Sequence, residues 1–207
     1  MLKVWGRTTS SNVQKVMWAI GEMGLQYERV DIGGPYGMNK EPSYLAMNPN
    51  GLVPTLEEDG GFLLWESNSV VRYLATKHKG AIMPGDLRTQ ALASQWMDWQ
   101  LSVSGPAITP VFWGLVRTPP EKRDNDAIAA GQAKSTDAMR ILDAQLAKTE
   151  FVAGKDFTVG DIPVGIVAYR FTKLCPDRPK LANFERWYAA LEARPAFQEH
   201  VVSIPFV

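Results

Sequence analysis

The chain has 207 residues, 45% of them hydrophobic, and equal numbers of basic and acidic residues, 22 of each. This length suits two small domains, and the apolar content supports a packed core and argues against a disordered chain. The balanced charge argues against a nucleic-acid partner or a membrane surface, and no apolar run approaches the roughly 18 residues of a membrane span. A single cysteine rules out an intrachain disulfide. Because the N-terminus also lacks a signal-peptide pattern, we expect a cytoplasmic protein.

The first eighty or so residues alternate between strands and helices. Strands are predicted from short apolar runs, helices from apolar residues that recur every three or four positions, and a hairpin from the turn Asp59-Gly60-Gly61. Gly24 is placed to end the first helix in a left-handed turn. The predicted order is βαβαββα, with strands at Leu2–Trp5, Tyr27–Ile32 and on either side of the hairpin turn, and helices at about Asn12–Met23, Pro42–Met47 and Ser67–His78.

From Leu87 onward the pattern is helical only. "TQALASQWMDWQL" predicts one helix, and "GPAITP" after it is expected to interrupt or bend the chain, because proline cannot donate to a helical ladder. A long helix follows Pro119-Pro120. "TVGDIPVGIVAYRF" predicts a buried helix that begins with a capping box, in which Thr158 accepts from the backbone of Asp161 and the Asp161 carboxylate reaches back. "NFERWYAALEARPAF" predicts the last helix. The expected domains are residues 1–80 and 87–207, joined by a linker at about 81–86.

Four consecutive hydroxyl side chains, Thr8 to Ser11, lie where the first strand ends and the first helix begins. Ser11 or Asn12 is placed to cap that helix, and capping and turn formation alone would explain the run. A functional alternative is a hydroxyl that donates a hydrogen bond to a bound substrate.

Two further motifs suit a peptide-like ligand. Val53-Pro54 stands at the start of a strand, where a cis bond would turn the N–H and C=O of Val53 outward to pair with an extended ligand. Ser67 reads as a helix N-cap whose positive helix end attracts a carboxylate, and Glu66 beside it suits an ammonium group. Each motif also has a purely structural explanation. A turn at the start of an edge strand would explain Val53-Pro54, and a helix cap would explain Ser67.

In this order and spacing, "SNVQKVMWAIGEMGLQYERVDI", "LAMNPNGLVPTL", "LLWESNSVVRYLA" and "TVGDI" resemble the cytosolic glutathione transferase superfamily over essentially the whole chain. "NPNGLVP" and "GLVRTPPE" are most similar to bacterial theta-like and nitrogen-regulator-like members. The resemblance implies a thioredoxin-like domain at 1–80 that binds glutathione as co-substrate. It also implies an all-helical domain at 87–207 that contributes the electrophile site, and a homodimer.

The resemblance also implies residue roles. Ser10 aligns with the active-site serine of theta-like members and Asn12 with an asparagine near the thiol in the nitrogen-regulator-like branch; Thr9 and Ser11 remain alternatives. Leu52 stands where a lysine often binds the glycyl end. The residues implied in glutathione binding are Val53 and Pro54 for the cysteinyl unit, Glu66 and Ser67 for the γ-glutamyl head, and Asn39, Lys40 and Asn50 for the glycyl carboxylate.

A hydroxyl at that junction has a clear chemical use. A free thiol titrates near ~8.5, and a hydrogen bond to its thiolate is worth roughly 1.5–3 kcal/mol, which lowers the thiol pKa by about 1–2 units. The helix N-terminus adds about 0.3–1 kcal/mol. Most of the bound thiol is then ionised at neutral pH without a protein base. A cysteine there would instead form a mixed disulfide, so its absence argues against a disulfide reductase of the two-cysteine type.

The expected second substrate is a small electrophilic organic compound, halogenated ones included, bound against the helical domain. Aromatic surface would come from Phe112 and Trp113, with Trp96 and Trp99; the alternative for these residues is ordinary core packing. Arg117 would hold an anionic group of the substrate; its alternative is an ion pair. No metal-ligand spacing is present, so no metal is expected. Two alternative functions stay open: glutathione-dependent reduction of disulfides or peroxides, and a non-catalytic glutathione-binding regulatory module.

Overall fold

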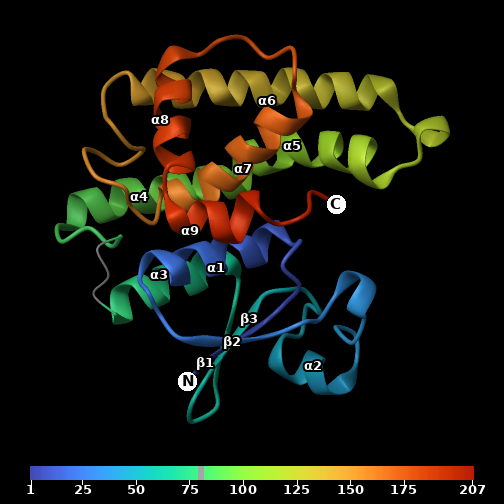
Figure 1. The fold of residues 1–207 in the computed structure, drawn as a ribbon, viewed down its shortest axis with the longest axis vertical. Helices are drawn as coiled ribbons and strands as arrows, with labels where there is room; N and C mark the ends of the chain where they lie inside the picture. Colours follow the sequence, from blue (N-terminus) through green and yellow to red (C-terminus); the bar gives the residue numbers. More distant parts are fainter. Residues whose placement is uncertain (79–81) are drawn as a thin grey trace. The chain divides into compact units, whose positions relative to one another are not determined.

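The computed structural model describes residues 1–78 and 82–207, which form two compact units. The first unit comprises Met1–Met83 with Pro195–Phe206, and the second comprises Pro84–Arg194 with Val207 (Figure 1). Residues 79–81, where the predicted first domain ends and the linker begins, lie outside the described residues.

The first unit contains a four-stranded mixed sheet in the order β2-β1-β3-β4. β1 pairs in parallel with β2, because α1 returns the chain to the same end of the sheet, whereas β3 and β4 form the predicted antiparallel hairpin. The strands are β1 (Leu2–Trp5), β2 (Tyr27–Val30), β3 (Thr55–Glu58) and β4 (Phe62–Trp65).

Three α-helices complete the predicted βαβαββα order, and the thioredoxin-like fold class is confirmed. α1 and α3 lie side by side against the sheet, while α2 lies apart from that pair (Figure 1). Gly24 has a φ of 62° and ends α1 in the expected left-handed turn. The helices are α1 (Ser11–Glu22), α2 (Pro42–Met47) and α3 (Ser67–Lys77), with a short 3₁₀ turn at Gly34–Tyr36.

The C-terminal segment belongs to the first unit. α8 (Ala182–Glu192) ends before Pro195, and a new short helix, α9 (Pro195–Phe197), begins at that proline. The prediction of one helix through "ARPAF" was therefore wrong, since a residue before proline is disfavoured in helical conformation. The ring of Phe197 packs on that of buried Trp18 in α1, with centroids 4.6 Å apart.

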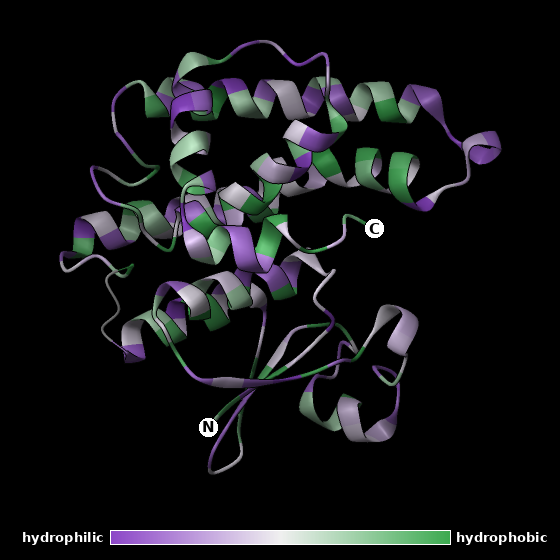
Figure 2. Cartoon of the chain, viewed as in Figure 1, coloured by the Kyte–Doolittle hydropathy of each residue, from purple (hydrophilic) through white to green (hydrophobic). Residues whose placement is uncertain are grey.

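The second unit is helical. Its elements are α4 (Leu87–Trp99), α5 (Gly105–Phe112), α6 (Asn125–Leu146), α7 (Asp161–Leu174) and α8, with π-helical turns at Gln100–Ser104 and Trp113–Arg117 and a 3₁₀ turn at Pro120–Lys122. Figure 2 shows hydrophilic and hydrophobic residues alternating along α6, as expected for a helix with one buried face. No helix in the described part of the chain is long and apolar enough to cross a membrane.

"GPAITP" does not interrupt the helical path. Helical geometry continues from Leu87 to Arg117, and the π-helical turn Gln100–Ser104 leads directly into α5. Pro106 occupies the first turn of α5, where a missing N–H costs no intrahelical bond; only Pro110 lies inside the helix. The expected interruption was wrong for that reason.

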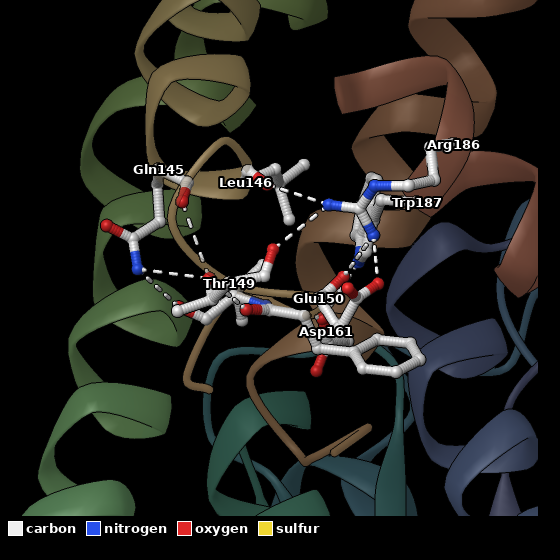
Figure 3. A network of polar contacts seen from close by, with 9 residues as sticks. Gln145, Leu146, Thr149, Glu150, Asp161, Arg186 and Trp187 are labelled. Atoms are coloured by element: carbon white, nitrogen blue, oxygen red, sulfur yellow. Dashed lines mark hydrogen bonds and ion pairs between the residues drawn. The ribbon is translucent and has the colours of Figure 1, made fainter. Parts of the chain in front are cut away.

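A buried polar network joins α6, α7 and α8 (Figure 3). The Asp161 carboxylate accepts from the backbone N–H of Thr158 at 2.9 Å, the N–H of Val152 at 3.0 Å and the indole N–H of Trp187 at 2.9 Å. Half of the predicted capping box is thus confirmed. The other half was wrong, because the Thr158 hydroxyl accepts from the N–H of Gly160 instead and donates to Asp161.

Candidate active site

The junction between β1 and α1 leaves its hydroxyl groups available. Ser10 is the N-cap of α1, in extended conformation, and its side chain makes no capping hydrogen bond. The prediction that Ser11 or Asn12 caps the helix was wrong, since α1 already begins at Ser11. The half-buried side chains of Thr8, Thr9, Ser10 and Ser11 have no hydrogen-bond partner within residues 1–78 and 82–207. Capping therefore does not account for the run, and four hydroxyl donors remain beside a positive helix end.

Gly6 brings this junction against the Val53-Pro54 segment. A Cβ at Gly6 would lie 2.4 Å from Cγ2 of Val13 and 3.3 Å from Cβ of Val53. No side chain fits there, so glycine permits the close approach of the two segments.

The Val53-Pro54 peptide bond is cis, as the sequence suggested. The backbone N–H and C=O of Val53 take part in no hydrogen bond with any described residue. The residue before it is fixed, because the carbonyl of Leu52 accepts from the Tyr44 hydroxyl at 2.7 Å and from the Asn48 amide at 2.9 Å. A free backbone donor and acceptor on an anchored segment can pair with an extended peptide.

The start of α3 differs from the prediction. Ser67 is the first helical residue, and the N-cap is Glu66, which has a φ of 70° and makes no side-chain cap bond. A positive φ is uncommon outside glycine and concentrates at functional sites. Glu66 is exposed, and its carboxylate has no partner among the described residues. Sequence reasoning missed this turn because nothing in "WESNS" specifies a left-handed residue.

The N-termini of α1 and α3 meet at this site. The buried Ser67 hydroxyl donates to the Asn12 side-chain oxygen, 3.4 Å away. Two positive helix ends therefore point to one region, which attracts a carboxylate, while Glu66 attracts an ammonium group. Together with the Val53 backbone, the first unit presents groups for an amino-acid head, a peptide bond and a thiol.

The residues predicted for a glycyl carboxylate make hydrogen bonds within the loops that flank α2; the side chain of Asn50 donates to the side-chain oxygen of Asn48 at 3.1 Å. The Asn39 amide donates to the carbonyl of Gly51 at 2.7 Å, and the Lys40 ammonium to the carbonyl of Asn50 at 3.3 Å. Each retains further donors. Leu52 is exposed at the same loop.

The aromatic residues predicted for the second substrate differ in exposure. Trp96 and Phe112 are buried, whereas Trp113 is 60% exposed. Trp96 packs edge-on against Trp99, with ring centroids 4.9 Å apart. The core-packing alternative therefore fits Trp96 better than Trp113.

The alternative role of Arg117, an ion pair, is not formed with a side-chain carboxylate of any described residue; Arg117 donates to the main-chain oxygen of Val207 at 2.9 Å. Its guanidinium lies over the ring of Phe112, as does that of Arg170, which sequence reasoning missed. The sequence feature that could have indicated Arg170 was a single arginine in the apolar run "IVAYRF".

Burial raises the pKa of the Cys175 thiol to about 11, which makes it unreactive. No group of three potential metal ligands occurs in the part of the chain that the structure describes.

Comparison with known proteins agrees with this geometry. Residues 9–77 match the family model described as "Glutathione S-transferase, N-terminal domain". Over 99% of both chains, the sequence is 41% identical to the Escherichia coli protein named glutathione S-transferase GstB. The chain belongs to the glutathione S-transferase family.

Other relatives extend this family assignment. Glutathione S-transferase 3 of Zea mays is 31% identical, with 99% of this chain and 95% of the maize protein covered. The glutathione-bound crystal structure of a theta class glutathione S-transferase from Xanthomonas axonopodis pv. citri aligns with a TM-score of 0.94 and 41% identity, over 100% and 99% of the two chains. This protein is accordingly a glutathione transferase.

Proposed function

We propose that this enzyme conjugates the thiolate of glutathione to small electrophilic organic compounds, halogenated ones included. The observation that supports this most directly is the set of unpaired hydroxyls at the N-terminus of α1, next to the free Val53 backbone. Residues of the first unit bind glutathione, and residues of the second contribute the electrophile site.

Each glutathione-binding group has a separate role in this proposal. Val53, fixed by Pro54, pairs with the cysteinyl backbone; Glu66 binds the γ-glutamyl ammonium, and the helix end at Ser67 its carboxylate. Asn39, Lys40 and Asn50 bind the glycyl carboxylate.

Thiol activation is assigned to the donors Thr9, Ser10, Ser11 and Asn12. A donated hydrogen bond and the α1 N-terminus both stabilise negative charge on the sulfur. The thiol proton leaves to solvent, the sulfur lone pair forms the new C–S bond, and the leaving group departs with its electron pair. Asn12 accepts from Ser67 through its oxygen, which leaves its amide N–H groups as donors.

The first prediction concerns the bound thiol. We expect its pKa to be about 6–7 in the wild-type enzyme, and to rise by about 1–2 units when the true donor is removed in a set of T9V, S10A, S11A and N12A variants. Thiolate absorbance of bound glutathione, followed against pH, measures it. Ser43→Ala, an exposed serine at the start of α2, is the matched control. An unshifted thiol pKa in the wild type would refute the catalytic mechanism and favour the non-catalytic binding module.

Glutathione-dependent disulfide or peroxide reduction is the second candidate. The absence of a cysteine at the junction is compatible with it when two glutathiones supply the sulfurs, and the donor amide of Asn12 is the feature that favours it. Turnover of a disulfide without turnover of alkyl halides would place this activity first.

The proposal also covers the oligomeric state of the protein and its location in the cell. A homodimer is proposed from the resemblance to the family, and cytoplasmic location from the single, buried cysteine. Sedimentation of the purified protein tests the first of these.

A further inference from the structure

Two arginines flank one aromatic ring in the second unit. The Arg170 guanidinium, from α7, lies 4.1 Å from the centroid of the Phe112 ring at the end of α5. The Arg117 guanidinium, from the following π-helical turn, lies 5.6 Å from the same centroid. Both distances are within the range of a cation–π contact.

No side-chain carboxylate of a described residue pairs with either arginine. Arg170 makes no hydrogen bond or ion pair with any described residue, and Arg117 donates to the main-chain oxygen of Val207. Burial, with Arg117 as the second cause, lowers the pKa of Arg170 to about 10. Arg170 is therefore still cationic at neutral pH.

Arg170 is largely withdrawn from water, whereas Arg117 is exposed beside it. A buried charge next to a like charge destabilises a fold unless an anion binds beside it. Arginine also presents a planar fork of N–H donors that matches a carboxylate in two-point contact. Phe112 supplies an apolar wall, which strengthens such a contact by excluding water. Trp113, the next residue, is largely exposed and offers surface for the carbon skeleton.

We propose that Arg170, together with Arg117, binds the carboxylate of the electrophile, so that the enzyme selects small organic acids over neutral compounds of the same size. This inference rests on the proposed conjugation function and specifies its substrate class.

The test uses the full chain and a matched pair of probes, iodoacetate and iodoacetamide, which differ in charge but hardly in size. With either probe the sulfur of glutathione forms a C–S bond, iodide leaves with the electron pair of the C–I bond, and the thiol proton goes to solvent. The uncatalysed reaction with glutathione at the same pH corrects for their intrinsic reactivities.

We expect the corrected kcat/KM of the wild type to favour iodoacetate by at least tenfold. Arg170→Met should lower this preference at least tenfold, mainly through the KM for iodoacetate, with a smaller loss in R117M and partial retention in R170K. Arg140→Met, at an exposed arginine of α6, should leave the preference unchanged. Because Arg170 adds an unneutralised charge, the Tm of R170M should equal or exceed that of the wild type.

Binding of the two products provides a readout independent of turnover. By calorimetry, S-(carboxymethyl)glutathione should lose at least tenfold in affinity in R170M relative to its neutral carbamoylmethyl counterpart. If the wild type turns over neither halide, conjugation fails, and the binding preference still decides the role of the arginines. Equal weakening of both products, no preference in the wild type, or a Tm several degrees lower in R170M would overturn the inference.

Discussion

Single residues define this site through what they leave unpaired. Glu66 is held at positive φ with a free carboxylate, and Val53 has a free backbone N–H and C=O. The hydroxyls from Thr8 to Ser11 are likewise without partners among the described residues. Because Glu66 is exposed and the hydroxyls are half-buried, these groups can bind a ligand without the loss of an internal hydrogen bond.

At this scale we predict separate effects on binding and on thiol activation. Glu66→Gln keeps the shape of the side chain but removes its charge, and should weaken glutathione binding by about tenfold, the worth of one charge-assisted contact of about 1.4 kcal/mol. The thiol pKa should change by much less, because the role proposed for Glu66 is to bind the γ-glutamyl ammonium and not the thiol. Calorimetry and the absorbance titration measure the two quantities.

Glu121→Gln, at an exposed glutamate of the second unit, is the matched control and should change neither quantity. Equal effects of Glu66→Gln on affinity and on thiol pKa would mean that Glu66 contacts a different part of glutathione.

Among the elements, the helices of the second unit are joined at their ends by polar contacts. Arg186 of α8 donates to the carbonyls of Leu146 and Thr149 at the end of α6, at 2.7 and 3.0 Å (Figure 3). The contact with Leu146 satisfies a carbonyl that α6 leaves open at its C-terminus. Asp161, the first residue of α7, instead accepts from the loop N–H groups of Val152 and Thr158, and burial raises its pKa to about 6 despite these donors.

Asp161→Asn should be strongly destabilising. All four of its hydrogen bonds are accepted from donors, so the NH₂ of asparagine would face an N–H group and leave buried donors unpaired. We expect a loss of about 3–5 kcal/mol in the free energy of unfolding, measured by urea denaturation. Asp156→Asn, at an exposed aspartate nearby, should cost less than about 0.5 kcal/mol. A similar small cost for Asp161→Asn would contradict this account.

The same elements show what sequence could predict. The strands, the hairpin and most helix bounds follow from hydrophobic periodicity and turn residues, and the cis Val53-Pro54 bond from its place before a strand. The N-cap at Glu66 and the free hydroxyls did not follow, because they depend on backbone torsions that many residues permit. The Arg117–Phe112–Arg170 arrangement joins residues more than fifty positions apart, which no local pattern specifies.

At the scale of the molecule, the first unit depends on both ends of the described chain. His200, in the C-terminal segment, is so close to α1 that a Cβ on Gly21 would lie 2.8 Å from its ring, and its ring also meets that of Tyr27. Burial lowers the pKa of His200, although Glu199, 3.8 Å away, opposes the shift.

A pH dependence of stability follows from this burial. The unfolded chain takes up a proton on His200 near pH 6.5 while the folded chain resists it, so this contribution is complete above pH 6.5 and is lost as the pH falls through that value. His200→Gln should therefore flatten the decline in unfolding free energy between about pH 7 and pH 5. His78→Gln, at an exposed histidine, should retain the wild-type slope. An unchanged slope in His200→Gln would show that another group is responsible.

The return of residues 195–206 to the first unit also has a consequence for biosynthesis. A ribosome makes the sheet and its helices early, yet the side of α1 that carries Trp18 waits for Phe197 until nearly all of the second unit has been translated. The first unit therefore lacks this part of its core, and keeps the corresponding apolar surface of α1 exposed, until residues 195–206 have left the ribosome.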